Sequence, residues 1–168
     1  MFDRDQEFQG RHASYIKFLC NDKKVFNRYI DVYMLGAVMG ILHARQAEPD
    51  KSSPDGAKIL AGVFANERLK CEFLFQLIMI LDQSDPVSDE QRLDRAFRVD
   101  DSNPIALAGN MDLFHRYVRG GIDVLREEFA ECTTDDDYII KMAEIVALFD
   151  RDGDGNSYDE LIKSIIGS

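Results

Sequence analysis

The spacing of apolar residues is the strongest structural signal in this chain. Apolar positions recur three and four residues apart, which is the period of one face of an α-helix, and no segment keeps the two-residue alternation of a half-buried strand for long. The pattern therefore predicts an all-α protein. With cap and turn signals it predicts helices over residues 12–19, 25–44, 57–82 with an interruption near Ala65 and Asn66, 88–97, 104–117 and 138–149.

Residues 25–44 are apolar on nearly every side, so this helix is expected at the centre of the core. Gly36 and Gly40 are four residues apart and share one face of it, as a close crossing with another helix requires. One apolar stripe also runs along the helix expected to end at residue 82; it consists of Leu69, Phe73, Leu77 and Ile80.

Two residue pairs mark expected helix starts. Ser88 followed by Gln91 has the spacing of a capping box. Asn103 followed by Pro104 is typical of an N-cap with proline in the first turn.

Further along, residues 119–121 read Arg-Gly-Gly. Two adjacent glycines are poor helix formers, so the helix is expected to bend or break there and to resume over residues 122–129. Thr133 or Thr134 is expected to cap the helix that follows.

The length of 168 residues suits one domain, or one domain with an appendage, and the composition of 45% hydrophobic and 30% charged residues is that of a soluble globular protein. We expect a single compact helical bundle over residues 1–132. A helix–loop–helix appendage is expected over residues 133–168.

The negative charge is concentrated near the C-terminus. From Glu127 onward the chain has twelve acidic and three basic residues, whereas the preceding 126 residues have nineteen acidic and seventeen basic ones. An acidic surface repels phosphates, and no basic run with interleaved aromatic residues occurs, so nucleic acid is not an expected partner.

Three widely separated cysteines, an odd number, argue against a disulfide framework and favour a reducing cytoplasm. The first residues lack the basic and then apolar pattern of a signal peptide. The longest apolar run, residues 33–42, is too short to span a bilayer, so a membrane location is not expected.

The acidic loop FDRDGDGNSYDEL, residues 149–161, is the main candidate for chemistry. Its aspartates fall at positions one, three and five of a calcium loop, Gly155 falls at position six, and the backbone carbonyl of Asn156 would serve at position seven. Glu160 comes one residue before the twelfth position. Two interpretations are open: a calcium site, or a solvated acidic turn between two helices.

The last thirty residues resemble an EF-hand. The apolar residues of the preceding helix support this resemblance, since they precede Asp150 by eight, five, four and one residues; they are Met142, Ile145, Val146 and Phe149. The resemblance implies a weak or structural calcium site in a loop that is one residue short. Its ligands would be Asp150, Asp152, Asp154, Asn156 and Glu160.

No catalytic motif is present. The three histidines, His12, His43 and His115, are dispersed and are expected to be ordinary surface or boundary residues. Cys71 is expected in the core. The mixed charges of Asp100, Asp101, Arg92, Arg95 and Arg98 are typical of a solvated face. The sequence therefore predicts a protein that is not an enzyme.

The body, from about residue 25 to 129, is similar to small helical proteins associated with bacterial DNA phosphorothioation (Dnd) defence loci. The matching residues are Tyr29, Asp31, Ala37, Gly40, Tyr117, Gly120, Gly121 and Leu125. This resemblance implies a bacterial accessory protein in defence against phage that acts through partners. No catalytic residues come with it.

These observations predict a non-enzymatic helical binding or accessory protein with a protein partner and a calcium site in its tail. The alternative is a phage-defence accessory protein that acts through protein partners without metal. A nucleic-acid-binding or enzymatic role is the third hypothesis.

Overall fold

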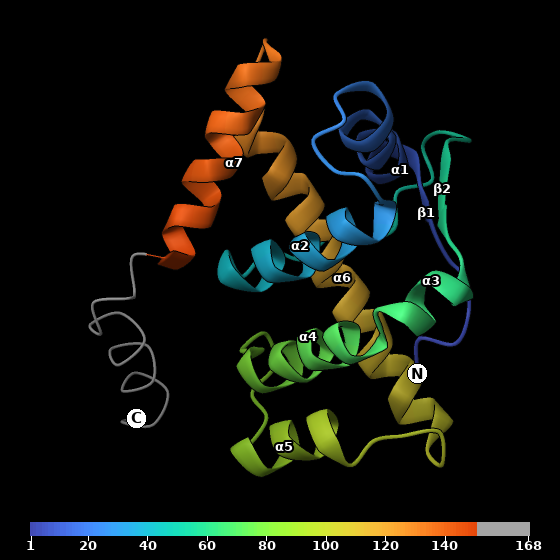
Figure 1. Cartoon of the computed structure of the whole chain (residues 1–168). Coiled ribbons are helices and arrows are strands. Elements are labelled where there is room, and N and C mark those ends of the chain that lie inside the picture. Colours follow the sequence, from blue (N-terminus) through green and yellow to red (C-terminus); the bar gives the residue numbers. More distant parts are fainter. Residues whose placement is uncertain (151–168) are drawn as a thin grey trace. The chain divides into compact units, whose positions relative to one another are not determined.

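The computed structural model describes the backbone of residues 1–150 and the side chains of residues 1–147. It consists of two units, Met1–Glu127 and a second one that begins at Glu128. The elements of the first unit, in chain order, are β1 (Gln6–Gln9), α1 (Gly10–Lys17) with a π-helical turn (Phe18–Asp22), α2 (Tyr29–Leu42), β2 (Gly56–Ile59), α3 (Ala61–Asn66), α4 (Arg68–Leu81), α5 (Asp89–Phe97) and α6 (Pro104–Glu128) (Figure 1).

The prediction of a helical protein is confirmed, but a small sheet was missed. β1 and β2 pair antiparallel, with Gln6 opposite Ile59 and Gln9 opposite Gly56. Each strand has four residues, which is too short for a recognisable alternation. Residues 57–59 are therefore extended, and the prediction that they begin a helix is wrong.

Helix α2 begins at Tyr29, four residues later than predicted. The amides of Val25 and Phe26 bond back to the carbonyl of Leu19 at 2.9 and 3.4 Å, so these residues close the preceding π-helical turn. Lys24 has a φ of +53°, which is incompatible with continuing a right-handed helix. The helix itself lies in the core, as predicted, with Val32, Tyr33 and Ala37 fully buried.

The backbones of α2 and α6 touch at glycines. A Cβ atom added to Gly121 would overlap the carbonyl oxygen of Gly36 and would lie 2.6 Å from the amide nitrogen of Gly40. A Cβ atom on Gly40 would overlap the carbonyl oxygen of Tyr117. The predicted close crossing through Gly36 and Gly40 is therefore confirmed, and Gly121 is its other side. Gly120 lies against the backbone of Arg45 and Gln46, which follow α2.

Of the bend or break predicted at residues 119–121, the break is wrong, because α6 runs without interruption from Pro104 to Glu128. Glycine costs about 1 kcal/mol in a helix interior relative to alanine. Here the absence of a side chain is what permits contact with α2, and the packing at this contact offsets that cost. Gly120 and Gly121 thus weaken α6 locally, but the close approach of neighbouring backbone requires them.

The predicted helix boundaries between residues 60 and 104 are largely confirmed. α3 and α4 are separated at Glu67, close to the predicted interruption. Ser88 and Gln91 form both hydrogen bonds of a capping box at the start of α5. Asn103 Oδ1 accepts a hydrogen bond from the Ala106 amide at 3.2 Å at the start of α6.

An aromatic cluster fills the core between these elements. Tyr33 on α2 is its centre, with ring centroids 5.2 Å from Phe64 and 5.8 Å from Phe114 in edge-on arrangements. Phe8 from β1 meets the same ring at 5.9 Å. Cys71 is fully buried, which confirms its predicted place in the core. The three cysteines are free thiols.

The second unit contains α7 (Asp135–Asp150). Thr134 caps this helix, as predicted, because its Oγ1 accepts a hydrogen bond from the Asp137 amide at 3.3 Å. Tyr138 on α7 packs against Phe129 with a ring-centroid distance of 5.5 Å. Within residues 1–150, no helix combines the length and apolar character needed to cross a membrane.

The glycine crossing predicts opposite effects for two alanine substitutions on α6. Gly121→Ala should lower the free energy of unfolding by more than about 3 kcal/mol or prevent folding, because the new methyl group meets backbone that cannot yield. Gly109→Ala is the matched control, since nothing lies within 4 Å of its Cβ position, and it should raise stability by about 0.5 to 1 kcal/mol. Urea denaturation measures both, and equal effects would contradict the close crossing.

Candidate functional site

Helix α4 exposes an apolar stripe instead of burying it. Its buried face is formed by Cys71, Phe75, Ile78 and Met79. Leu69 and Phe73, from the stripe singled out in the sequence, are 82% and 63% exposed, and Leu77 and Ile80 are half-buried. Because α4 is apolar on two sides, its periodicity alone cannot show which side faces the core.

The charged residues at the start of α4 form ion pairs whose two partners differ in exposure. Arg68 bonds to Glu72 at 2.7 Å, with side-chain exposures of 61% and 29%. Lys70 bonds to Glu67 at 2.8 Å, with exposures of 68% and 11%. The cationic groups therefore stand out beside Leu69, whereas the carboxylates are largely covered.

We call Leu69, Phe73, Leu77 and Ile80, with the flanking Arg68 and Lys70, the α4 face. Leu69 and Phe73 are one helical turn apart, so their side chains are neighbours on the helix surface. Large apolar residues that cluster on a surface are typical of a contact site. Arg68 and Lys70 are the more exposed members of the two ion pairs beside these apolar side chains.

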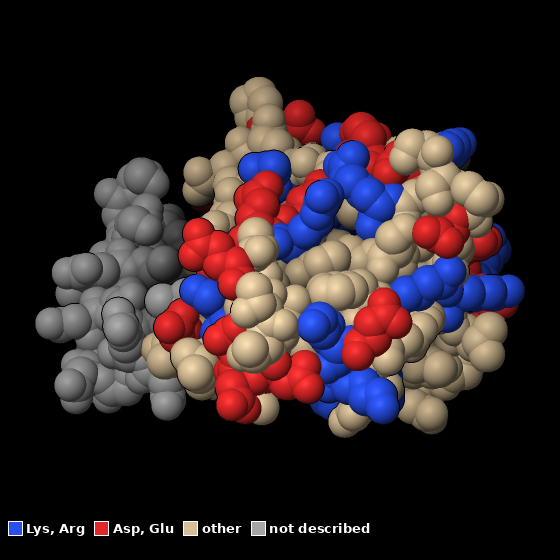
Figure 2. All heavy atoms as spheres, turned by 90° about the horizontal axis from the view of Figure 1, so that it is seen from above, with Lys and Arg blue, Asp and Glu red and all other residues tan. Residues whose placement is uncertain are grey.

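On the face shown in Figure 2, basic and acidic side chains are interspersed over the described elements. Arg95 differs from the prediction of a solvated face, because its Nη1 lies 3.5 Å from Oδ2 of the buried Asp82. Interspersed charges produce only a weak long-range field.

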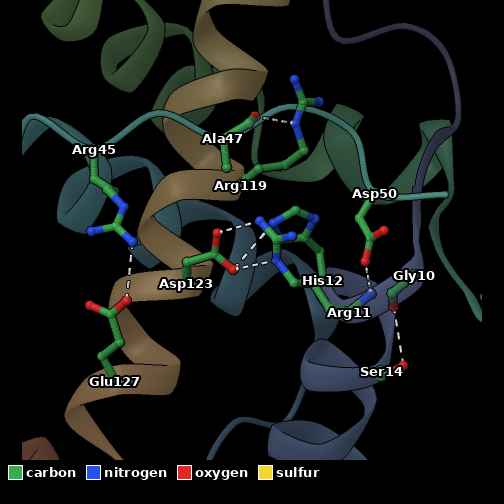
Figure 3. Close-up of polar contacts among 10 residues, drawn as sticks. All are labelled: Gly10, Arg11, His12, Ser14, Arg45, Ala47, Asp50, Arg119, Asp123 and Glu127. Carbon is green, nitrogen blue, oxygen red and sulfur yellow. Dashed lines mark hydrogen bonds and ion pairs between the residues drawn. The ribbon is translucent and has the colours of Figure 1, made fainter. Parts of the chain in front are cut away.

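A polar cluster joins α1 to α6 (Figure 3). Arg11 donates from Nε and Nη2 to the two carboxylate oxygens of Asp123, at 3.0 and 2.9 Å. His12 Nε2 lies 3.4 Å from Asp123 Oδ1. The backbone amide of Arg11 also donates to Asp50 Oδ2 at 2.7 Å. Burial opposes ionisation of Asp123, but the contacts with His12 and Arg11 outweigh it and hold the pKa of this carboxyl below its usual range.

This cluster holds the fold together and is not an open site. Both oxygens of Asp123 are already engaged by Arg11, and His12 is almost fully buried. The prediction of a surface or boundary position for His12 is therefore wrong. A Cβ atom on Gly10, which has a φ of +58°, would lie 2.5 Å from Asp50 Oδ2, so this glycine lets the loop close over the start of α1.

A second buried network ties the end of α4 to the middle of α6. Asp82, after α4, is fully buried, and its Oδ1 accepts hydrogen bonds from Tyr117 Oη at 2.7 Å and from Ser84 Oγ at 2.6 Å. Burial raises the pKa of Tyr117 to about 12, and its bond to Asp82 adds to this. Burial opposes ionisation of Asp82 too, yet the bonds from Ser84 and Tyr117 keep its pKa lowered.

His115 is half-buried, which fits the predicted surface or boundary position. Its Nε2 lies 3.1 Å from the hydroxyl of Tyr33 in the aromatic core. Burial, together with the nearby charge of Arg119, lowers the pKa of His115 to about 4, and burial raises the pKa of Tyr33 well above its usual value. His115 is therefore neutral at physiological pH. His43 is exposed, as predicted.

The predicted calcium ligands lie at or beyond the end of the described structure. Asp150 is the last residue of α7, and Asp152, Asp154, Asn156 and Glu160 fall outside the described residues. Among residues whose side chains are described, no group of three His, Cys, Asp or Glu residues could hold a metal ion. The calcium site stays a prediction from sequence.

Comparison with protein-family models, curated proteins and solved structures finds no match to this chain. The resemblances to an EF-hand and to the defence-associated proteins are therefore neither supported nor contradicted by relatives. Functional inference rests on the chain's own residues.

The neutral state of His115 predicts a specific pH dependence of stability. Its pKa of about 4 in the folded protein lies below the ordinary value of 6.5, so the unfolded chain takes up the proton first. The contribution of neutral His115 to the free energy of unfolding is therefore complete above pH 6.5. It is lost as the pH falls toward 4, and this loss is roughly 3 kcal/mol at most. His115→Gln should flatten the urea-unfolding profile over this range.

His43→Gln is the control for this experiment, because His43 is exposed and should leave the pH profile unchanged. A wild-type profile with the same slope as that of His115→Gln would show that His115 does not carry this dependence.

Proposed function

We propose that this protein is a non-enzymatic binding protein that docks a protein partner on the α4 face. The exposure of Leu69 and Phe73, one turn apart on a well-packed helix, is the observation that carries the proposal. Burying each of these side chains against a partner would contribute about 1.5 to 3 kcal/mol. Two such anchors suffice for a specific, moderate affinity.

The partner surface is an amphipathic helix or strand with acidic flanks. Its apolar side chains would cover Leu69 and Phe73, and its carboxylates would meet Arg68 and Lys70, whose cationic groups are accessible. Rim charges of this kind change the association rate and the choice of partner more than the final affinity.

The structural contacts of the buried titratable groups support a non-enzymatic role. The carboxylates of Asp82 and Asp123 are bonded to tyrosine, serine and arginine side chains that join helices. Asp82 Oδ1 and both oxygens of Asp123 thus serve to join helices, whereas Asp82 Oδ2 has only a 3.5 Å contact with Arg95 Nη1.

The resemblance to defence-associated proteins suggests where to find the partner. If the protein acts in a bacterial phage-defence system, its partner is encoded among the genes next to its own. Modification or restriction enzymes are the products expected there. The alternative function, a metal-independent accessory role in defence, uses the same α4 face.

We predict that two polar substitutions on the α4 face weaken partner binding. The variant Leu69→Gln with Phe73→Gln keeps good helix formers at both positions, so stability should change by less than about 1 kcal/mol. Its affinity for a neighbouring gene product that binds the wild-type chain should fall at least about tenfold, as measured by calorimetry.

Ile105→Gln is the matched control, since Ile105 is 86% exposed on α6 and lies outside the α4 face. It should bind the partner as the wild type does. Unchanged affinity of the α4 double variant, with an affinity loss in the control, would place the binding surface elsewhere.

The acidic tail supports a second function, calcium binding. This proposal rests on the sequence alone: Asp150, Asp152 and Asp154 at alternate positions, a glycine after them, and Glu160 to clasp the ion. Three closely spaced carboxylates repel one another, and a divalent cation relieves that repulsion. The competing interpretation is an acidic turn that binds only solvent.

Calorimetric titration of the full chain with calcium tests the tail. We expect binding in the micromolar to millimolar range, and an increase in melting temperature that Asp152→Ala abolishes without lowering the metal-free melting temperature. Asp89→Asn on α5 is the control for a general loss of negative charge. Absence of heat at millimolar calcium would leave the solvated turn as the correct interpretation.

A further inference from the structure

The first unit contains a cavity of about 540 Å³ that neither the α4 face nor the tail uses. It lies between the N-terminal segment and the first turns of α6, and its apolar wall is formed by Phe2, Phe64, Leu107, Ala108 and Met111. This volume is within the range of sites that enclose small organic molecules.

One wall of the cavity is held in place at a conformational cost. Phe2 has a φ of +55°, a region that a residue with a side chain occupies at a cost of about 1 kcal/mol or more. Its ring packs on Phe64 and on Phe114, both at centroid distances of 5.8 Å, and these contacts hold it there. The wall is thus part of the packed core.

The floor of the cavity is uncharged. Tyr33 and His115 line it and are joined by the 3.1 Å contact between the tyrosine hydroxyl and Nε2. The pKa of His115, lowered to about 4 by burial and by Arg119, leaves the imidazole neutral at physiological pH. A charged group brought to this floor would lose its hydration and find no counter-ion.

The charges at the cavity rim are mostly compensated. Asp5 accepts a bond from Lys58 at 2.6 Å and from the Ala61 amide at 2.9 Å. Asp101 lies 3.7 Å from the amino group of Met1. The two other charged lining residues, Asp3 and Arg4, have opposite signs. The rim therefore does not select strongly for either a cation or an anion.

We propose that this cavity binds an uncharged, largely apolar small molecule, with a ring system as its preferred shape. The stacked rings of Phe2 and Phe64 would form one side of the binding surface, and Leu107 and Met111 on α6 would enclose the edge of the ligand. The inference is independent of the partner proposed for the α4 face.

Three probes with one ring system and different charge test the proposal. They are 2-naphthalenemethanol, 2-naphthylmethylamine, which is cationic at pH 7, and 2-naphthoate. Binding to the full chain is measured by methyl NMR, with Met111 and Ala108 as reporters in the cavity and Met39 in the core as the reference. The neutral alcohol should bind at least about tenfold more tightly than either ion, because only the ions lose hydration without compensation.

Each outcome has a defined meaning. Equal binding of the three probes, or tighter binding of the amine or the carboxylate, would overturn the preference for an uncharged ligand. Failure of all three to shift the Met111 and Ala108 signals would overturn the cavity as a binding site, and it would leave the α4 face untouched.

A pair of phenylalanine substitutions locates the bound probe. Ala108→Phe places a ring in the cavity from an exposed position on α6, and it should reduce the affinity for 2-naphthalenemethanol at least about tenfold. Ile105→Phe adds the same ring to α6 outside the cavity and should leave the affinity unchanged. Unchanged affinity in Ala108→Phe, with a folded spectrum, would show that the probe binds elsewhere.

Discussion

The contact between the backbones of α2 and α6 is the constraint on which the first unit depends. Gly121 on α6 lies against the backbone of Gly36 and Gly40 on α2, with no room for a side chain. Tyr117 and Asp123 lie on α6 just before and just after this contact. The Tyr117 hydroxyl donates a hydrogen bond to Asp82 at the end of α4, and the Asp123 carboxylate accepts one from Arg11 on α1. These bonds fix α6 relative to α4 and α1, and the glycine contact fixes it relative to α2.

This arrangement explains how α4 can expose apolar residues without becoming unstable. Its inner side is anchored by Phe75 and Ile78 in the core and by the buried carboxylate that follows it. Exposed Leu69 and Phe73 therefore contribute little to folding, which leaves them available for a partner. The same anchoring gives the partner a rigid helix to bind, and rigidity lowers the entropic cost of association.

Local sequence signals predicted the features that depend on neighbouring residues. The capping box at Ser88, the N-cap at Asn103 and the small-residue face of α2 are confirmed. Features that depend on distant residues were missed: the unbroken course of α6 requires knowledge of its contact with α2. Predicting the burial of His12 requires knowledge of its contact with Asp123, which is more than a hundred residues away. For α4, two apolar sides were present, and only the tertiary structure distinguishes the buried one.

Native-state hydrogen exchange tests the central role of the helix crossing most directly. If the α2 and α6 contact organises the first unit, the amides of Gly40 and Gly121 should exchange only through global unfolding, with the same free energy and the same dependence on denaturant. Exchange at Gly40 through a local opening, at a free energy several kcal/mol below that at Gly121, would contradict the account.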